Sequence, residues 1–407
     1  MNTEHILICG GGIGGLALAQ GLKKDGISIA VYERDKSAHA RSQGYRVGIN
    51  SDGARALAAC LPENLFQLII ETSCKPITGR MASYDTELKE RFSRTIPQPM
   101  TELSSDSGAP KIAPYTGVNR LTLREVLLAG LDDIVHFDKT LERYEQIEGG
   151  KVRVVFTDGT IAVGDLLVGA DGTNSTVREQ LIPDAKLTEM GRTIYGKTLL
   201  TASTSEWLPE NFYNGMTGIE GPNGLGMVIV GFRKRESFAH ATAKLAPTVS
   251  LTEPQDYLMW SVHVSDLQVS TTDDEFHHAD PTTLLTIARN LVKDWHPILQ
   301  RVVDEAQADG TFPITIRYAE SVKQWQMENV TLLGDAIHTM PPTRGVGANT
   351  ALKDADLLHN KLAAVKRKEI SLVQAKTEYE EKMLHYGFEA VSKSVHEPYF
   401  NSPYARS

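Results

Sequence analysis

The chain has 407 residues, of which 41% are hydrophobic and 23% charged, so its composition is that of a globular protein long enough for two or three domains. A formal net charge of -9 argues against a nucleic-acid-binding surface, which needs basic patches, and no apolar run approaches the roughly 18 residues of a membrane span. Three cysteines are too few for a disulfide framework, and an apolar strand beginning at His5 leaves no room for a leader peptide, so we expect a cytoplasmic protein.

The N-terminal residues predict a nucleotide-binding βαβ unit. Residues 5–10 form an apolar strand that runs into a glycine cluster with the spacing G-x-G-x-x-G, starting at Gly10. A helix follows, and then a second strand over residues 28–32 that ends at Glu33. In this motif the glycines allow the tight turn, the approach of a pyrophosphate and close helix packing, and the acid binds ribose hydroxyls. Because Glu33 would repel a 2′-phosphate, we expect FAD or NAD here rather than NADP.

The next stretch carries fewer signals. Residues 41–53 are rich in turn-forming residues around one short strand. Arg41 and Arg46 are candidates to face the cofactor, although surface arginines are the commoner case. A helix is expected from Ala54, and residues 97–110 are typical of a loop rich in Pro, Ser and Gly.

Residues 119–128 predict an amphipathic helix with a polar start. A cation in the first turn opposes the helix dipole, so Arg120 is a candidate functional residue, with a solvated arginine as the equal alternative. Residues 151–163 alternate like a β-hairpin around Asp158-Gly159.

A second apolar strand that ends in an acid lies at residues 165–171. Asp171-Gly172 closes this strand, and Ser175 or Thr173 is expected to cap the following helix. Ligands of open α/β sheets bind at the carboxyl ends of the strands, so we expect Asp171 to lie near the glycine turn.

Residues 190–320 predict a separate, mainly antiparallel sheet with helices, including a helix near residues 281–303. His277 and His278 are adjacent, but no Cys, His or acid with matched spacing accompanies them, so a solvated loop is favoured and no metal is expected. The strand-like runs lie at residues 193–200, 225–232 and 257–264.

Arg192 and Tyr195 are the candidates for catalysis or substrate binding, because they stand where the chain enters this sheet. Alternation on a strand puts residues 193, 195 and 197 on one face and Arg192 on the other. The two side chains would therefore line a common pocket only if the strand began after a bend at Gly191. A surface arginine and a core tyrosine are the alternative.

A third strand ending in an acid organises the C-terminal part of the chain. Residues 330–333 are apolar and run into Gly334-Asp335. Two prolines then stop the chain, and Gly345 and Gly347 allow close approach to a ligand before a helix begins at Ala348. A helix N-terminus there would favour an electron-rich ligand. A further charged helix is expected from residue 371 to about residue 394.

In this order, the three motifs resemble those of the single-component FAD-dependent monooxygenases of the aromatic hydroxylase type, with the para-hydroxybenzoate hydroxylase fold. Residues 10–15 with Glu33 are similar to the family's dinucleotide fingerprint, residues 167–178 to its Asp-Gly motif, and residues 333–349 to its Gly-Asp motif. Many members carry smaller residues where this chain has Arg344, which makes Arg344 a candidate to touch flavin or substrate.

The resemblance implies an α/β fold in which a Rossmann-like FAD-binding domain carries an inserted, mainly antiparallel substrate-binding sheet and C-terminal helices. The expected FAD-binding domain comprises residues 1–75, 111–188 and 322–362, the substrate-binding domain residues 76–110 and 189–321, and the C-terminal helical segment residues 363–407.

The resemblance also implies roles for single residues. Glu33 would bind the adenosine ribose and Asp335 the ribityl chain, Arg120 would lie along FAD, and backbone amides of residues 347–349 would face the flavin C2 carbonyl. The Asp171 segment is associated in the family with both FAD and the nicotinamide cofactor. The expected cofactor-binding residues are Gly12, Ile13, Gly14, Glu33, Arg34, Arg46, Arg120, Asp171, Asp335, Gly345, Gly347, Ala348 and Asn349.

The activity implied is that of a monooxygenase. NADPH or NADH reduces FAD, reduced flavin captures O2 as a C4a-hydroperoxide, and one oxygen atom passes to an aromatic or other electron-rich small molecule. Because the chain has no second G-x-G-x-x-G motif, the nicotinamide is expected to dock transiently. A monomer or homodimer is expected.

Three alternatives are less favoured. An FAD-dependent halogenase shares the fold, but its W-x-W-x-I-P motif is missing and the four tryptophans are scattered singly. A plain NAD dehydrogenase would explain residues 5–33 and leave Asp171 and Asp335 without a role. A flavin-free scaffold, like the escort proteins of prenylated GTPases, would not need Glu33 and Asp335.

Overall fold

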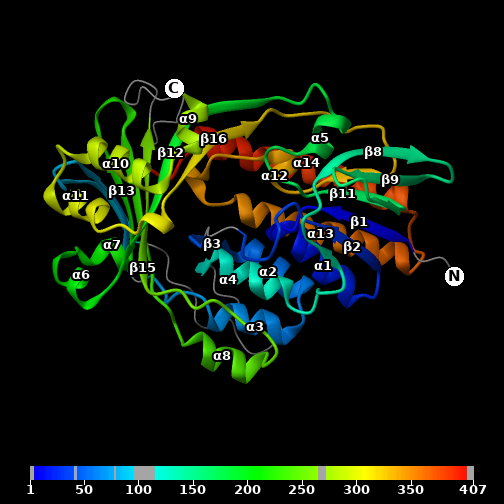
Figure 1. The fold of residues 1–407 in the computed structure, drawn as a ribbon, viewed down its shortest axis with the longest axis horizontal. Helices are drawn as coiled ribbons and strands as arrows, with labels where there is room; N and C mark the ends of the chain where they lie inside the picture. Colours follow the sequence, from blue (N-terminus) through cyan, green and yellow to red (C-terminus); the bar gives the residue numbers. More distant parts are fainter. Residues whose placement is uncertain (1–3, 41–43, 78, 96–114, 265–271, 401–407) are drawn as a thin grey trace.

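The computed structural model describes residues 4–40, 44–77, 79–95, 115–264 and 272–400 (Figure 1). Arg41 and the loop expected at residues 97–110 lie outside this range. The fold has two main parts, a parallel sheet with its helices on the right of Figure 1 and a larger sheet on the left.

A five-stranded parallel sheet forms the centre of the first part, with the strand order β17-β11-β1-β2-β7. The central strands are apolar and almost wholly buried, as expected of parallel strands covered on both faces. The strands are β1 (His5–Cys9), β2 (Ser28–Tyr32), β7 (Val135–His136), β11 (Leu166–Gly169) and β17 (Val330–Leu332). The three strands expected to precede the glycine turn, Asp171 and Asp335 are thus neighbours in one sheet.

Two layers cover this sheet. The helices α1 (Ile13–Lys24), α2 (Ser51–Cys60) and α13 (Gly347–Lys366) pack against one another, and α14 (Leu372–His396) packs on α13. A three-stranded antiparallel sheet packs on β1 and β11, and it contains the expected hairpin. Its strands are β8 (Leu141–Ile147), β9 (Lys151–Phe156) and β10 (Ile161–Gly164).

The second part is a seven-stranded sheet with the order β16-β12-β15-β14-β13-β4-β5, antiparallel except where β13 pairs with β4. Its strands are β4 (Arg80–Asp85), β5 (Glu90–Thr95), β12 (Leu187–Leu199), β13 (Met216–Glu220), β14 (Gly226–Phe232), β15 (Tyr257–Val264) and β16 (Phe312–Ala319). A two-stranded ribbon of β3 (Arg46–Asn50) and β6 (Tyr115–Asn119) completes the strands of the described residues. The α/β class with an inserted, mainly antiparallel sheet is confirmed, whereas the exact domain boundaries stay a prediction.

The outer face of the seven-stranded sheet carries its own hydrophobic core, in which Trp260 and Ile194 pack against helices of residues 281–304. The long helix expected over residues 281–303 is wrong, because the chain forms two helices, α10 (Pro281–Val292) and α11 (Pro297–Asp304). Pro297 cannot donate a backbone hydrogen bond inside a helix, and it instead starts the second one.

Two other helix starts show how caps set the boundaries. α2 begins at Ser51 rather than Ala54, because the Asn50 side chain accepts hydrogen bonds from the amides of Asp52 and Gly53, at 3.0 Å each. α5 (Thr176–Leu181) is capped by Ser175, one of the two residues expected.

The remaining helices are shorter or lie at the periphery. No helix of the described residues is long and apolar enough to cross a membrane. These remaining helices are α3 (Glu63–Glu71), α4 (Arg120–Leu128), α6 (Ala202–Trp207), α7 (Glu210–Asn214), α8 (Phe238–Leu245), α9 (Asp273–His278), α12 (Asp335–His338) and the 3-10 turns η1 (Pro222–Gly224), η2 (Ala308–Gly310) and η3 (Pro342–Arg344).

Gly10 and Gly12 provide a matched pair for testing this packing. Gly10 has φ +117°, and an added Cβ would overlap the Ala170 carbonyl oxygen and lie 2.8 Å from the Asp171 nitrogen, whereas an added Cβ on Gly12 would meet no atom within 4 Å. We predict that Gly10→Ala lowers the unfolding free energy of the flavin-free protein by at least about 1–3 kcal/mol, while Gly12→Ala changes it little. Urea unfolding measures both values, and equal midpoints would contradict the assignment of Gly10 to the β1–β11 contact.

Candidate functional site

One large cavity of about 1060 Å³ lies between the carboxyl ends of the parallel strands and the inner face of the seven-stranded sheet. The glycine turn, Asp171 and Asp335 all line it, so the three sequence motifs meet in one place. This is where ligands bind in open α/β sheets. The cavity extends beyond them to residues of β12, β14 and β15.

The glycine turn and Glu33 form the first end of the cavity. The Glu33 side chain is nearly buried, and its carboxylate accepts hydrogen bonds from the amide of Gly11 at 2.6 Å and from that of Asp35 at 2.9 Å. Gly12, Ile13, Gly14 and Arg34 line the same end. The carboxylate is thus fixed where β2 ends.

Arg124 is a residue that the sequence analysis missed. Its guanidinium is almost fully buried and donates to the Gly11 carbonyl at 3.1 Å and to the Ala38 carbonyl at 2.6 Å. It also lies 3.5 Å from the Asp35 carboxylate and 3.8 Å from that of Glu33. A buried cation between two carboxylates holds the turn after β2 in place. Its position one helical turn after Arg120 was the available signal.

Asp171 lies at the edge of the cavity, where β11 ends. Burial raises the pKa of its carboxyl group, although one carboxylate oxygen accepts a hydrogen bond from the Val177 amide at 3.2 Å. Arg178 joins this loop to the third motif, because its guanidinium donates to the carbonyls of Thr173 at 2.8 Å and Ala336 at 3.0 Å. The second and third motifs are therefore held together by one arginine.

Asp335 faces the cavity from the start of α12, and Arg120 lines the cavity nearby. The Asp335 side chain is open to the cavity space but lies deep among protein atoms, and this desolvation raises the pKa of its carboxyl group. The charges of His338 and Arg120 act in the opposite direction. Arg120 also lies over the ring of Tyr45, 5.7 Å from the ring centre.

A buried hydrogen-bond network supports the loop before Asp335. The Asp354 carboxylate accepts from the Gly334 amide at 2.8 Å and from the Tyr386 hydroxyl at 2.6 Å, and it lies 2.7 Å from Nε2 of His338. Burial by itself would lower the pKa of His338, but the Asp354 carboxylate raises it. Three helices, α12, α13 and α14, are thus tied to the end of β17.

The start of α13 contributes Gly345, Gly347 and Ala348 to the cavity, whereas Asn349 does not line it. Asn349 is buried. Its side-chain Nδ2 donates to the Gly48 carbonyl at 2.8 Å, and its side-chain Oδ1 accepts from the backbone amide of Asn50 at 2.9 Å. The Asn349 side chain therefore fastens α13 to β3, and the expected contact of its backbone amide with the flavin stays a prediction. Arg46 does line the cavity, from the first residue of β3.

The inner face of the seven-stranded sheet forms the other wall of the cavity. Along β15, Met259, Ser261 and His263 line the cavity, while the residues between them belong to the outer core. This is the two-residue period of a strand with different environments on its two faces. Val228 and Val230 of β14 likewise line the cavity, while Ile229 between them belongs to the outer core.

Tyr195 and Arg192 lie on opposite faces of β12, so the structure does not bring the two candidates together. Tyr195 lines the cavity and stacks on Phe312, with ring centres 5.5 Å apart. Arg192 does not line it and instead lies over the ring of Phe276, 5.3 Å from its centre. The irregularity in β12 falls between Glu189 and Gly191, before Arg192, and so cannot turn Arg192 toward the Tyr195 face.

His263 is a second residue that the sequence analysis missed. It is buried, and burial lowers its pKa to about 4, so its imidazole is neutral near pH 7. Its Nδ1 lies 3.0 Å from the Thr193 hydroxyl. The cavity wall thus offers neutral polar groups, Tyr195, Ser261 and His263, among methionine and valine side chains.

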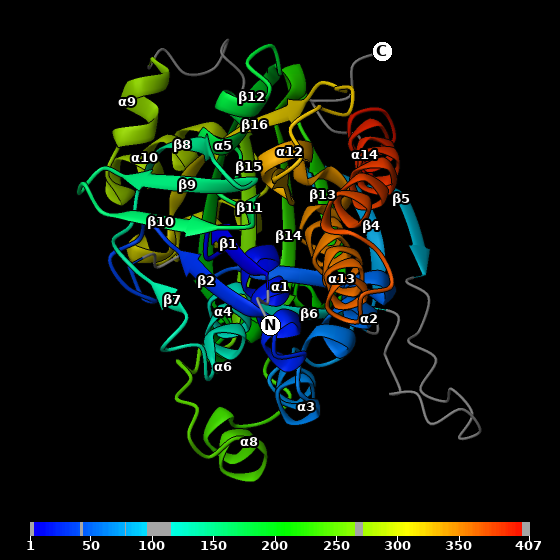
Figure 2. The ribbon, with the colours of Figure 1, turned by 90° about the vertical axis from the view of Figure 1, so that its right-hand side faces the viewer.

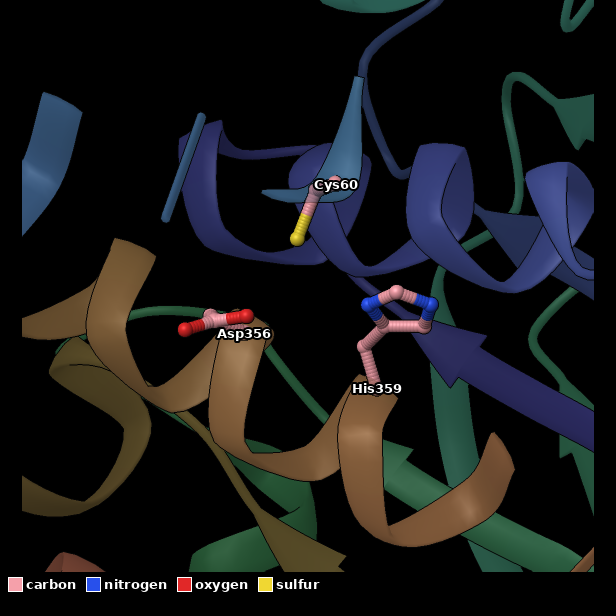
Figure 3. A group of neighbouring side chains, drawn as sticks. All are labelled: Cys60, Asp356 and His359. Carbon is pink, nitrogen blue, oxygen red and sulfur yellow. The ribbon is translucent and has the colours of Figure 1, made fainter. Parts of the chain in front are cut away.

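A separate cluster of Cys60, Asp356 and His359 lies near the C-terminal end of α1, where α13 packs on α1 and α2 (Figure 3). The donor atoms of these side chains lie within 4.8 Å of one another. The Asp25 carboxylate orients His359 at 2.9 Å, and burial raises the pKa of the Cys60 thiol, which disfavours the thiolate that a metal ion needs. The expectation of no metal stays a prediction. His277 and His278 contact Thr315 and Asp274, respectively.

The residues of the cavity fit an FAD molecule. Added Cβ atoms at Gly12 and Gly345 would meet nothing within 4 Å, so bare backbone faces open space at both places. Glu33 and Asp335 stand at the ends of β2 and β17, where acceptors for the ribose and the ribityl hydroxyls are needed. Together these features define a flavin-nucleotide-binding protein.

Comparison with known proteins agrees with this class. A family model described as an FAD binding domain matches residues 3–381, so the chain belongs to this family of flavoproteins. The crystal structure of a candidate FAD-containing monooxygenase from Photorhabdus luminescens subsp. laumondii superimposes with a TM-score of 0.79 at 31% identity, covering 96% of each chain.

Curated relatives carry related names. The dual O-methyltransferase/FAD-dependent monooxygenase CTB3 of Cercospora beticola is 31% identical over 88% of this chain, and the chain spans only 42% of that relative. The FAD-dependent monooxygenase phnB of Penicillium herquei is 28% identical over 96% of this chain and 89% of the relative. With the family model and the 31% identical structure, these names place the chain in the family of FAD-dependent monooxygenases, with FAD as its cofactor.

Replacing Glu33 tests the assignment of the ribose end. We predict that Glu33→Ala weakens FAD binding by about 1.5–3 kcal/mol, because the ribose hydroxyls lose a charged acceptor and the Gly11 amide loses its partner. Glu33→Gln keeps an acceptor for the Gly11 amide, so its FAD affinity should lie between those of the parent and of Glu33→Ala. Calorimetric titration of the flavin-free proteins gives the affinities, with Glu305→Ala, a change in an exposed ion pair of α11, as control. Equal affinity in Glu33→Ala and the parent would remove Glu33 from the site.

The His338–Asp354 pair predicts a pH-dependent stability. Because the folded-state pKa of His338 is raised, its contribution is fully present below the unfolded value of about 6.5 and is lost as pH rises through the folded-state pKa. We therefore predict that His338→Gln costs more unfolding free energy at about pH 6 than at about pH 9. Urea unfolding at both pH values measures the difference, and His278→Gln, at an exposed position, is the control. A cost that is equal at the two pH values, or that rises with pH, would show that the folded-state pKa of His338 is not raised.

Proposed function

We propose that the protein is an FAD-dependent monooxygenase that inserts one atom of O2 into an aromatic or other electron-rich small molecule, with NADPH or NADH as reductant. The observation that carries this proposal is the continuity of one cavity, from the nucleotide-binding turn to a largely apolar wall with a few polar groups. Its family membership and the names of its relatives point the same way.

The chain's own residues would hold and shield the cofactor. Bound flavin supplies the redox and oxygen chemistry. Glu33 would bind the ribose hydroxyls, Asp335 the ribityl hydroxyls, and the turn at Gly12 the pyrophosphate. The N-terminus of α13 at Gly347 and Ala348 would stabilise negative charge on the flavin by about 0.3–2 kcal/mol.

The sheet wall would hold the substrate. Met259 and Val230 supply apolar contact, and the neutral imidazole of His263 and the hydroxyl of Ser261 can exchange hydrogen bonds with a phenol or enol. A wall of this kind excludes water from the reacting face, which favours oxygen transfer over unproductive loss of peroxide. The reductant would dock transiently, because the chain contains a single G-x-G-x-x-G motif.

Two details of assembly belong to the same proposal. We infer that the FAD-binding part comprises residues 1–75, 111–188 and 322–362, the substrate-binding part residues 76–110 and 189–321, and the C-terminal helical segment residues 363–407; the presence of two main sheets supports this division. The protein would act as a monomer or homodimer.

The test is oxygen transfer by the FAD-loaded protein. We expect NADPH or NADH oxidation to accelerate with at least one member of a panel of phenols, polyketides and indoles, and the product to gain one 18O atom from 18O2. Incubation with 16O2 in H2 18O is the control, because an oxygen atom that comes from water argues against a monooxygenase. A chlorinated product in the presence of chloride would support a halogenase instead, and unlabelled products throughout the panel would overturn the proposal.

A further inference from the structure

We propose that residues 397–400, here called the strap, form a wall of the substrate cavity and set how large a ring system it admits. The inference deepens the proposed function and rests on it. The strap follows α14, which lies beside α13 in Figure 2 (orange to red). Its aromatic residues, Tyr399 and Phe400, both line the cavity, although they are far in sequence from every other part of the wall.

The strap is fastened to the turn that leads into α13. The Thr343 hydroxyl donates to the Ser394 carbonyl, and the Tyr399 amide donates to the Thr343 carbonyl at 3.2 Å. The Arg344 guanidinium donates to the Glu397 carbonyl at 2.6 Å. Gly345, the next residue, lines the cavity on the flavin side. The strap and the expected flavin loop are thus one hydrogen-bonded unit.

Two cations lie over the ring of Tyr399. The Arg344 guanidinium lies 4.7 Å from the centre of its ring, and that of Arg94, in β5, lies 5.4 Å from it. Both distances are within the range of cation–π attraction. Arg344, which the sequence marked as a candidate to touch flavin or substrate, lines the cavity and also positions the strap. Tyr399 therefore bridges the flavin side and the edge of the large sheet.

Phe400 rests on bare backbone of the sheet wall. A Cβ added to Gly218 of β13 would lie 2.6 Å from Cδ1 of Phe400, so this position leaves room for the ring only because it is glycine. Two methionines that line the cavity, Met216 and its cross-strand neighbour Met81, lie beside it. Methionine side chains adapt to different ligand shapes, whereas a planar ring seated on backbone does not. Phe400 is thus the rigid element of this part of the wall.

The chemistry of the wall indicates the ligand class. Adaptable thioethers and aromatic rings suit planar, fused-ring aromatic compounds, and the polar and charged side chains that also line the cavity, Glu220 and Ser261 among them, suit one or two hydroxyl groups on such a compound. Phe400 would determine how many fused rings fit, and Tyr399, through Arg344, would keep the cavity closed next to the flavin loop. Both are specificity and positioning residues rather than catalytic ones.

Ring-size selectivity tests this assignment directly. Phenol, 1-naphthol and 1-anthrol are the probes, and their binding to the FAD-loaded protein is measured from the perturbation of the flavin absorbance spectrum, without turnover. We expect Phe400→Ala and Phe400→Leu to shift the affinity ratio of 1-anthrol to phenol by about tenfold toward the larger probe, since space opens for a further ring. Phe92→Ala, at a half-exposed ring of β5 that does not line the cavity, is the matched control and should leave the ratio unchanged.

Closure by Tyr399 has its own readout. Iodide quenching of flavin fluorescence should increase several-fold in Tyr399→Leu, which removes the ring that the two arginines contact, and should stay at the parent value in Tyr399→Phe, which keeps this ring. The FAD content of each purified variant confirms that it is folded.

Two outcomes would overturn the strap assignment. One is an unchanged probe ratio in both Phe400 variants, and the other is equal iodide quenching in Tyr399→Leu and the parent. Neither readout depends on oxygen transfer, so probes that bind with the expected selectivity, together with no oxygenation of any compound of the panel above, would refute the proposed function and leave the strap assignment in place. Oxygenation of a compound of the panel, together with an unchanged probe ratio in both Phe400 variants, would refute the strap assignment and leave the proposed function in place.

Discussion

The contact on which the structure depends is the close approach of the Gly10 backbone to the Ala170 carbonyl, where the ends of β1 and β11 meet. No side chain fits between the two strands at this point, and the positive φ of Gly10 turns the chain directly into α1. Because β17 pairs with β11 in parallel, the acids that follow these strands are carried to the same edge of the sheet. A cavity for one extended dinucleotide follows from this packing.

Buried charged groups hold the loops that follow β2 and β17 at the carboxyl edge of the parallel sheet. Arg124 lies between the carboxylates of Glu33 and Asp35, and Asp354 gathers the Gly334 amide, His338 and Tyr386. A loop held by such groups keeps its shape because leaving any one of them unpaired costs several kcal/mol. The same arrangement makes the loops precise enough to present Glu33 and Asp335 to a ligand.

The two faces of the seven-stranded sheet have different roles: the outer face packs in a hydrophobic core, and the inner face lines the cavity. Trp260 and Val262 of β15 face the outer core, while Ser261 and His263, which alternate with them along the strand, face the cavity. Substitutions on the inner face can therefore change the ligand without changing the core. The C-terminal strap adds a further wall, and through Arg344 it connects that wall to the loop at Gly345.

The sequence by itself determined the parallel strands, the glycine turn, Glu33, Asp171 and Asp335, because the βαβ geometry ties each of these residues to its position within a short local motif. Only the tertiary structure decided that Arg192 points away from Tyr195, that Asn349 serves as a latch, and that Arg124, His263 and Phe400 belong to the cavity. These residues come from strands, helices and the strap, separated by tens to hundreds of positions, and their neighbours depend on sheet register and helix packing. Local patterns set neither, since a strand shows its period but not which face will meet a ligand.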